Sequence, residues 1–246
     1  MKRDELEQAT RLLKEAGSVA VLTGAGVSSE SGIPTFRDKM TGLWANYSPE
    51  ELATPEGFLK NPDLVWQWYD MRRTMVEEAS PNAGHLALCA LEEMSAAFTL
   101  ITQNVDRLHI RAGSKNVLEL HGDILTYRCF EQGHKAPFVE RGLKSPPLCH
   151  CGSRLRPNVV WFGEALPPAV FELARRAASA SKVFLVVGTS AVVEPAASLP
   201  RWAAFAGAKL IEINPQRTPL SSHVDIFIGG TSASVLPAIL EELKTL

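Results

Sequence analysis

The sequence predicts an α/β fold in which a doubly wound parallel sheet carries a smaller second lobe. Short apolar, often β-branched runs alternate with segments whose apolar residues recur at helical spacing. These runs are apolar throughout, as strands covered by helices on both faces must be. Two stretches, residues 38–81 and 123–158, do not follow this rhythm and are predicted to be insertions that build the second lobe.

Six of the runs are predicted to be parallel strands, with three helices between them. The strands cover residues 19–22, 98–101, 117–120, 183–187, 210–213 and 224–228. A helix at residues 5–16 follows from Leu6, Ala9 and Leu13, which recur every three or four positions. Further helices are predicted at residues 82–94 and 168–178. Ligands of such sheets bind outside the carboxyl ends of the strands.

The two insertions divide the chain into two predicted lobes. Residues 1–37, 82–122 and 159–246 form a Rossmann-like lobe, and residues 38–81 and 123–158 form the small lobe. The first insertion has no strand-like run and is predicted to be helical, whereas the second is rich in Gly, Pro, Cys and short polar turns. We expect a ligand cleft between the two lobes.

Composition excludes several classes of function. With 246 residues, 46% of them hydrophobic and 21% charged, the chain has the balance of a globular protein, and disordered or fibrous classes are excluded. Twenty-five Lys and Arg residues against 27 Asp and Glu give a net charge of −2, which creates no long-range attraction for nucleic acid or anionic lipid. No stretch approaches the roughly 18 apolar residues that cross a bilayer. The charged start, MKRDELEQATRLLKEAG, lacks the apolar core of a signal peptide, so we expect a cytoplasmic protein.

A glycine-rich loop follows the first predicted strand, in VAVLTGAGVSSESGIPTFR. Gly24 and Gly26 would let backbone amides approach a pyrophosphate at a helix N-terminus. Ser29 replaces the third glycine of the GxGxxG pattern, and no acidic residue stands where a ribose hydroxyl is usually bound, so this is not an ordinary dehydrogenase loop. A tight turn without a ligand would use the same glycines.

Further strand ends carry small or polar residues. Gly188, Thr189 and Ser190 follow the strand at residues 183–187, and Asn214 follows the strand at residues 210–213. A dinucleotide needs amide and hydroxyl donors from several strand ends, whereas packing alone does not call for them. This pattern favours a dinucleotide site over an empty turn.

Five longer motifs resemble those of one known family. They are TGAGVSSESGIPTFR, TQNVDRLHIRAG, LHGD, VVWFGE and VVGTS, and the match runs from about Val19 to the last predicted strand. In their order and spacing they resemble the sirtuin family of NAD-dependent protein lysine deacylases. The resemblance implies that NAD is consumed as a co-substrate and that proteins or peptides carrying acylated lysine are the substrates.

The same resemblance implies a set of NAD contacts. In the family, the glycine loop and Arg37 hold the diphosphate and ribose, and Phe36 covers the nicotinamide site. Polar residues after the second strand line the nicotinamide ribose pocket, although a polar loop that caps a helix would use the same residue types. The implied cofactor-binding residues are Gly24, Ala25, Gly26, Ser28, Phe36, Arg37, Gln103, Asn104, Asp106, Gly188, Thr189, Ser190, Asn214 and Ser232.

His121, in LEL-HGD at the carboxyl end of a strand, matches the family's general base, and Asn104 and Asp106 match its catalytic partners. A histidine that titrates near neutrality can take a proton from a ribose hydroxyl and return one later. In the family mechanism the acyl-lysine carbonyl oxygen attacks C1′ of the nicotinamide ribose and expels nicotinamide. His121 would then activate the 2′-hydroxyl, directly or through the 3′-hydroxyl, and water would release free lysine and 2′-O-acyl-ADP-ribose.

The implied peptide site is the segment Val160, Trp161, Phe162, Gly163 and Glu164. It matches the strand-like edge against which the family lays its peptide, with residues 193–195 facing it. Backbone pairing at such an edge gives affinity with little demand on the sequence of the peptide. An ordinary apolar loop would have the same composition.

Tyr69 and Arg72, in WQWYDMRR, resemble the branch of sirtuins that removes succinyl and malonyl groups. At positions i and i+3 of a helix they share one face, and a guanidinium can bind a carboxylate bidentately while the phenol adds a hydrogen bond. Ala53 matches a small residue that leaves the pocket wide. The alternative is that Tyr69 packs at a helix edge and Arg72 or Arg73 is solvated. We expect acidic acyl groups to be preferred and acetyl groups to be accepted as well.

Sirtuins usually hold a structural zinc between two cysteine pairs, and only part of that set is present here. Cys129 lacks its partner, and Cys149 and Cys151 are one residue closer together than in CxxC. A tetrahedral site needs four ligands, and His134 or His150 could supply the fourth. Both a zinc site and a metal-free, zinc-ribbon-like segment stay open, and either is favoured over disulfides.

Two other functions also stay open from the sequence. An NAD-dependent protein ADP-ribosyltransferase would share the first step but pass the ribose to a protein nucleophile, and a non-catalytic sensor would bind NAD or an acylated peptide without turnover. The presence of His121, Asn104 and Asp106 favours the deacylase. A monomer is compatible with the sequence, which names neither the oligomeric state nor the protein substrates.

Overall fold

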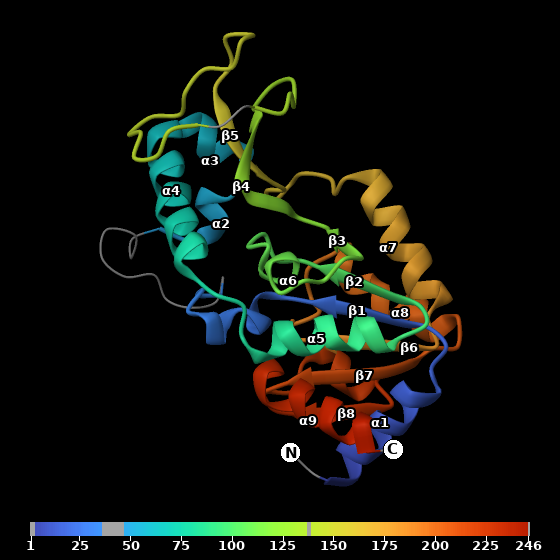
Figure 1. The fold of residues 1–246 in the computed structure, drawn as a ribbon. Helices are drawn as coiled ribbons and strands as arrows, with labels where there is room; N and C mark the ends of the chain where they lie inside the picture. Colours follow the sequence, from blue (N-terminus) through green and yellow to red (C-terminus); the bar gives the residue numbers. More distant parts are fainter. Residues whose placement is uncertain (1–2, 36–46, 137–138, 246) are drawn as a thin grey trace.

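A six-stranded parallel sheet forms the centre of the molecule in the computed structural model, which describes residues 3–35, 47–136 and 139–245 (Figure 1). The strand order is β3-β2-β1-β6-β7-β8, and each neighbouring pair is parallel. Strands β2 and β3 are added in turn on one side of β1, and β6, β7 and β8 are added in turn on its other side. This is the doubly wound arrangement that the sequence predicts. The strands are β1 (Val19–Thr23), β2 (Phe98–Thr102), β3 (Val117–Glu119), β6 (Val183–Val187), β7 (Lys209–Asn214) and β8 (Ile226–Gly229).

Helices cover both faces of this sheet. On one face α1 (Arg3–Glu15), α5 (Ala83–Met94) and α9 (Ser232–Thr245) pack against it, and on the other α7 (Pro168–Ala180) and α8 (Leu199–Phe205) do so (Figure 1). In β1, Val19 and Val21 enter the first core and Ala20 and Leu22 the second. This explains why the strand is apolar at every position, because both of its faces are buried.

In the part of the first insertion that the structure describes, residues 47–81, three helices pack on a separate antiparallel pair of strands. The helices are α2 (Pro49–Leu52), α3 (Pro55–Lys60) and α4 (Pro62–Glu78), and the strands are β4 (Gly122–Cys129) and β5 (Leu155–Val159). Thr54 and Asn61 cap α3 and α4 by accepting hydrogen bonds from Gly57 N and Leu64 N. These helices and the strand pair lie above the large sheet in Figure 1. Their buried aromatic residues belong to two small clusters that are separate from the cores of the large sheet. The lobe boundaries at residues 37, 81, 122 and 158 stay a prediction.

Three parts of the fold differ from the expectation or were not predicted. The glycine loop after β1 leads into two 3₁₀ turns, η1 (Ala25–Val27) and η2 (Ser29–Ser31), and not into an α-helix. Helices α8 and α9 were not predicted, and α9 contains Pro237 in its interior, a residue type that usually signals a helix end. The antiparallel strands β4 and β5 were also not predicted, because their register shifts between Asp123 and Tyr127 and disturbs the alternating pattern.

The remaining short elements are α6 (Leu108–Arg111), η4 (Ala196–Ser198) and η5 (Pro219–Ser222). Among the residues that the structure describes, none of the helices combines the length and the apolar character that a membrane span requires.

Candidate active site

The loops that follow β1 and β6 touch each other at the point where the strand order reverses. Gly24 N donates to Val187 O over 3.1 Å, and Gly26 N donates to Gly188 O over 2.8 Å. A Cβ atom on Gly26 would lie 2.7 Å from Gly188 O, and one on Gly188, whose φ is +58°, would lie 2.6 Å from Val27 N. Close approach of two backbones thus requires these glycines, and it places their loops at the edge where ligands of open α/β sheets bind.

Polar side chains from three strand ends join at Thr189. Gln103, after β2, donates from Nε2 to Thr189 Oγ1 over 3.0 Å, and Asn214, at the end of β7, donates from Nδ2 to Thr189 O over 2.8 Å. Ala25 and Ser190 are half-buried at the same edge. Ser232 follows β8 at the start of α9 and is buried against Gly84 of α5. Phe36 and Arg37 lie outside the described residues.

Ser28 is the centre of a buried hydrogen-bond network. Its hydroxyl donates to Asp106 Oδ2 over 2.7 Å and accepts from Asn104 Nδ2 over 3.1 Å. Asp106 also accepts from Leu108 N at Oδ1, over 2.9 Å. Burial raises the pKa of Asp106, and the hydrogen bonds from Leu108 and Ser28 oppose that shift. The structure therefore brings three predicted site residues into direct contact.

His85 joins this network, and the sequence analysis missed it. Its Nδ1 accepts from Asn82 N over 3.2 Å, so Nε2 carries the proton and points it at Ser28 Oγ, 3.3 Å away. Burial lowers the pKa of His85 to about 4, which keeps the ring neutral. The His109 ring packs against the His85 ring at a tilt of 54°, with ring centroids 4.8 Å apart, and contacts Thr23 Oγ1 at 3.0 Å. The signal in the sequence is the pattern Asn-x-x-His at the start of α5, where the histidine closes a capping box.

His121 stands just beyond β3, with one ring nitrogen fixed by the backbone. Its Nδ1 lies 2.9 Å from Gln103 O, and because a carbonyl only accepts, Nδ1 carries the proton. Nε2 is then the acceptor nitrogen of a neutral ring. Burial lowers the pKa of His121, and the bond to Gln103 O opposes this. A neutral imidazole with an exposed lone pair on Nε2 can act as a general base.

The segment from Val160 to Glu164 is fixed by the two arginines that hold Glu164. Arg156 donates from Nη2 to Glu164 Oε2 over 2.9 Å and pairs with Oε1 as well, and Arg128 donates from Nη2 over 3.1 Å. The Glu164 carboxylate also accepts from Trp161 N over 2.8 Å. Burial raises the pKa of Glu164, but its hydrogen bonds to Arg156 and Trp161 outweigh burial and lower the pKa below its usual value. Glu164 therefore shapes the segment, an assignment that the sequence did not make.

Ala53, Tyr69 and Trp161 meet in the core of the helical insertion. Trp161 Nε1 donates to the Tyr69 hydroxyl over 2.8 Å, and Ala53 O accepts from Phe162 N over 2.9 Å. Tyr69 is only 3% exposed, and burial raises its pKa. The predicted acyl pocket and the predicted peptide segment are thus in direct contact.

Arg72 and Arg73 have different environments. The Arg72 guanidinium lies 5.1 Å from the ring centre of Trp68; burial lowers its pKa, and the neighbouring Tyr69 and Asp106 oppose that shift. Arg73 is 1% exposed, pairs with Asp70 at 2.9 Å and lies 4.4 Å from the ring of Tyr127. Arg73 is therefore a core residue and not a solvated one.

Cys129, His134, Cys149 and Cys151 gather in the second insertion with all ligand atoms within 4.8 Å of one another. The two closest sulfurs, of Cys129 and Cys151, are 3.5 Å apart, and Cys149 Sγ is 3.7 Å from His134 Nδ1. Tetrahedral zinc with Zn–S bonds of about 2.3 Å separates two sulfur ligands by roughly 3.8 Å. The four residues therefore fit a zinc ion, with His134 as the fourth ligand. His150 stacks on His134 with ring centroids 4.7 Å apart.

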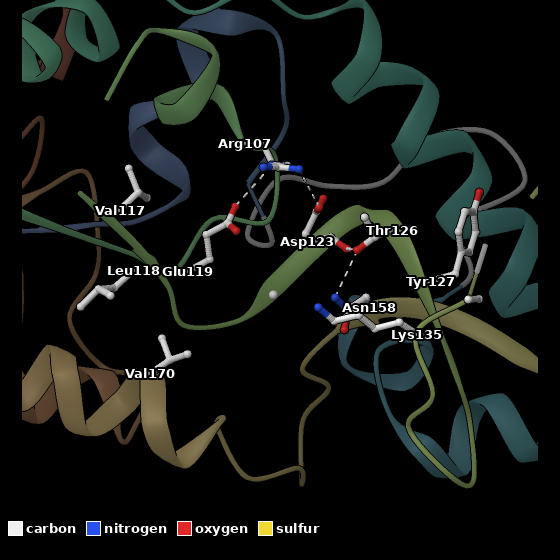
Figure 2. Close-up of a pocket in the computed structure, with 12 residues that line it drawn as sticks. Arg107, Val117, Leu118, Glu119, Asp123, Thr126, Tyr127, Lys135, Asn158 and Val170 are labelled. Atoms are coloured by element: carbon white, nitrogen blue, oxygen red, sulfur yellow. Dashed lines mark hydrogen bonds and ion pairs between the residues drawn. The ribbon is translucent and has the colours of Figure 1, made fainter. Parts of the chain in front are cut away.

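A cavity of about 440 Å³ lies among β3, β4, β5 and α7 (Figure 2). At its edge Arg107 lies between two carboxylates, 3.9 Å from Glu119 and 3.3 Å from Asp123. Burial and the Asp123 charge raise the pKa of Glu119 to about 7, against the opposing charge of Arg107. None of the predicted site residues lines this cavity.

Comparison with known proteins identifies relatives over nearly the whole chain. A family model described as the Sir2 family matches residues 24–195. NAD-dependent protein deacylase 2 of Pyrobaculum aerophilum is 50% identical over 234 residues, which cover 95% of this chain and 94% of that protein. NAD-dependent protein deacylase 1 of Archaeoglobus fulgidus is 48% identical over 241 residues, 97% of this chain and 98% of that protein.

Solved structures show the same similarity. The structure of a Sir2 homologue in complex with NAD has a TM-score of 0.91 and 47% identity, and it covers 97% of this chain and 94% of its own. A Sir2 complex with a p53 peptide and NAD⁺ has a TM-score of 0.88 and 34% identity, with 100% of both chains covered.

Proposed function

The chain belongs to the Sir2 family and is an NAD-dependent protein-lysine deacylase, and from this premise we propose that it removes acidic acyl groups, succinyl and malonyl, in preference to acetyl. The deacylase prediction is confirmed, and the transferase and sensor alternatives are set aside. The observation that carries the proposed preference is the pairing of Tyr69 with Arg72, one helical turn apart on α4.

Tyr69 and Arg72 offer what a carboxylate needs. Burial raises the pKa of Tyr69 and lowers the pKa of Arg72, which in both cases disfavours the charged form. Each side chain has therefore lost part of its hydration. A guanidinium in such a place gains strongly from an anionic ligand, since the low dielectric strengthens the attraction. The phenol adds a neutral donor beside it. A terminal carboxylate on the acyl chain can accept hydrogen bonds from both groups, whereas the methyl end of an acetyl group accepts from neither.

NAD supplies the electrophilic ribose carbon, whose bond to nicotinamide breaks when the acyl-lysine oxygen attacks. For this chain, we assign the glycine loop and the strand ends around Thr189 to binding of NAD. Ser28, Asn104 and Asp106 orient the nicotinamide end through their fixed network. His121 accepts the ribose hydroxyl proton at Nε2, because its Nδ1 is committed to Gln103 O.

The peptide backbone pairs with the segment from Val160 to Glu164. The structure differs from the expected strand-like edge, because residues 161–164 form a turn closed by a hydrogen bond from Glu164 N to Trp161 O over 3.0 Å. Support for this assignment comes from the exposed side chain of Phe162 and from the arginine clamp on Glu164, which fixes this turn. The solved Sir2 complex with a p53 peptide supports a peptide substrate in the same way. Recognition through the backbone would let the enzyme act on many acylated proteins.

Cys129, His134, Cys149 and Cys151 would hold a structural zinc ion, which would cross-link the loop ends of the second insertion. We also propose that the protein works in the cytoplasm. Its four cysteines are free thiols, and reducing compartments preserve such thiols.

Mass spectrometry of matched peptides tests the acyl preference. Peptides with acetyl-, succinyl- or malonyl-lysine are incubated with the purified protein, with and without NAD, and kcat/KM is compared. We expect the succinyl-to-acetyl ratio to favour succinyl and to fall at least tenfold in Arg72→Met. The matched control is Arg176→Met, which removes an arginine from the surface of α7 and should leave the ratio unchanged. An equal ratio for both acyl groups in the wild type would contradict the proposal.

A further inference from the structure

We propose that Trp161 is a positioning residue for acyl specificity, and that its indole N–H orients the Tyr69 hydroxyl so that the phenol proton points at an acidic acyl group. This inference rests on the proposed preference for succinyl and malonyl. It gives the segment from Val160 to Glu164 a second task besides pairing with the peptide backbone. The role belongs to a side chain, whereas the pairing belongs to the main chain.

The direction of the hydrogen bond is fixed by chemistry. An indole N–H can only donate, so at 2.8 Å from Trp161 Nε1 the Tyr69 oxygen must be the acceptor. The phenol has one proton, and it cannot point toward the group that donates to its oxygen. Among the described residues, no carbonyl or carboxylate accepts this proton. The proton of the Tyr69 hydroxyl is therefore available to a ligand that carries an acceptor.

The Tyr69 hydroxyl and the Trp161 indole have little contact with bulk solvent. Trp161 is 1% exposed and Tyr69 is 3% exposed, so both groups lie in the core that α3 and α4 form with β5. Burial raises the pKa of Tyr69, and the hydrogen bond from Trp161 opposes the rise. A phenol that accepts from an N–H is also a stronger donor, because hydrogen bonds in series polarise one another.

The indole itself is held in place from both sides. The Arg156 guanidinium lies 3.3 Å from the centre of the Trp161 ring, and Glu164 fixes that guanidinium. The Phe58 ring packs on Trp161 with centroids 5.4 Å apart. The ring therefore has no freedom to turn its N–H away from Tyr69, and the orientation of the phenol is built in before substrate binds.

Only an acyl group with an acceptor at its end can use this donor. A succinyl or malonyl carboxylate would accept from Tyr69 Oη–H and from the Arg72 guanidinium together. An acetyl group ends in a methyl and accepts from neither. The indole N–H should therefore change the ratio between acyl groups, and a loss of packing alone should not.

The test is a double-mutant cycle on the succinyl-to-acetyl ratio of kcat/KM, with NAD saturating. We expect Trp161→Phe to lower this ratio about five- to tenfold, chiefly through KM for the succinyl peptide. In the Tyr69→Phe background the same substitution should leave the ratio within about twofold. The proposal would be overturned if Trp161→Phe also changed the ratio in the Tyr69→Phe background. It would be overturned as well if Trp161→Phe lowered kcat/KM equally for the succinyl and the acetyl peptide.

A second replacement guards against loss of folding, because Trp161 is a core residue. Incorporation of 3-benzothienylalanine at position 161 replaces the indole N–H by sulfur and keeps the ring shape. It should lower the ratio as Trp161→Phe does, and an unchanged ratio would overturn the proposal. Failure of the proposed acyl preference can be distinguished from failure of the role of Trp161. If the preference is wrong, the wild type shows no preference and Arg72→Met leaves the ratio unchanged, whatever the Trp161 variants do.

Discussion

The amide of Val160 donates a hydrogen bond to the carbonyl oxygen of His121 over 2.8 Å. This bond joins the backbone of the candidate general base to the first residue of the candidate peptide segment. The His121 ring is tied in turn to the end of β2 through Gln103 O. The position of the base relative to a peptide thus depends on main-chain bonds and not on flexible side chains, which favours a fixed catalytic geometry.

The pH dependence of deacylation should follow His121. Since burial lowers its pKa, the neutral form persists to lower pH than for an exposed histidine, whose pKa is about 6.5. Activity requires the neutral form, so kcat/KM should fall as the pH decreases through a midpoint below 6.5. Initial rates between pH 5 and 9 measure this midpoint. His121→Ala should abolish the NAD-dependent loss of every acyl group, and a midpoint at or above 6.5 would contradict the assignment.

Removal of the Ser28 hydroxyl should destabilise the protein. Ser28→Ala leaves Asp106 Oδ2, Asn104 Nδ2 and His85 Nε2 without their shared partner in a buried place. Unsatisfied buried groups cost about 1–3 kcal/mol, so the free energy of unfolding should drop by about 2 kcal/mol or more. Urea titration followed by circular dichroism measures the loss. Ser29→Ala removes an exposed hydroxyl next to it and is the matched control; equal losses in the two variants would argue against the network.

Zinc should copurify with the protein at about one ion per chain. A chelator should then lower the thermal unfolding midpoint, because the ion holds together loop ends that have little apolar core of their own. Elemental analysis and thermal scans check both effects. Cys151→Ala should lose the metal and Cys89→Ser, far from the cluster, should keep it. Full metal content in Cys151→Ala would exclude this ligand set.

Glu119 should make stability depend on pH. Its pKa is raised from 4.5 to about 7 in the folded chain, so the folded state binds this proton more tightly than the unfolded state. The free energy of unfolding should therefore fall as the pH rises from about 4.5 to about 7, and each unit of pKa difference corresponds to about 1.4 kcal/mol. Glu119→Gln should remove part of this slope. Denaturant unfolding at pH 5 and pH 8 measures the slope for Glu119→Gln and for the control Glu241→Gln. Glu241 is an exposed glutamate, so its variant should keep the wild-type slope.

The strands of the large sheet and three of the helices could be predicted because their signal is local. Runs such as VAVL and VFLVV are apolar at every position, and both faces of β1 and β6 are buried. The β4–β5 pair could not be predicted in the same way. Its strands are separated by a long loop and joined with a register shift, so neither spacing nor alternation reports on it.

In the candidate site too, local motifs could be recognised from the sequence and contacts between separate elements could not. The motifs of the sequence by themselves determined the family, the use of NAD and most of the residues that stand at the strand ends, since each motif is a continuous stretch of chain. Only the tertiary structure decided that His85 completes the Ser28 network, that His134 joins the three cysteines and that Trp161 donates to Tyr69. The Trp161–Tyr69 contact joins residues 92 positions apart. Contacts of this kind depend on how separate elements pack, and no local pattern along the chain records them.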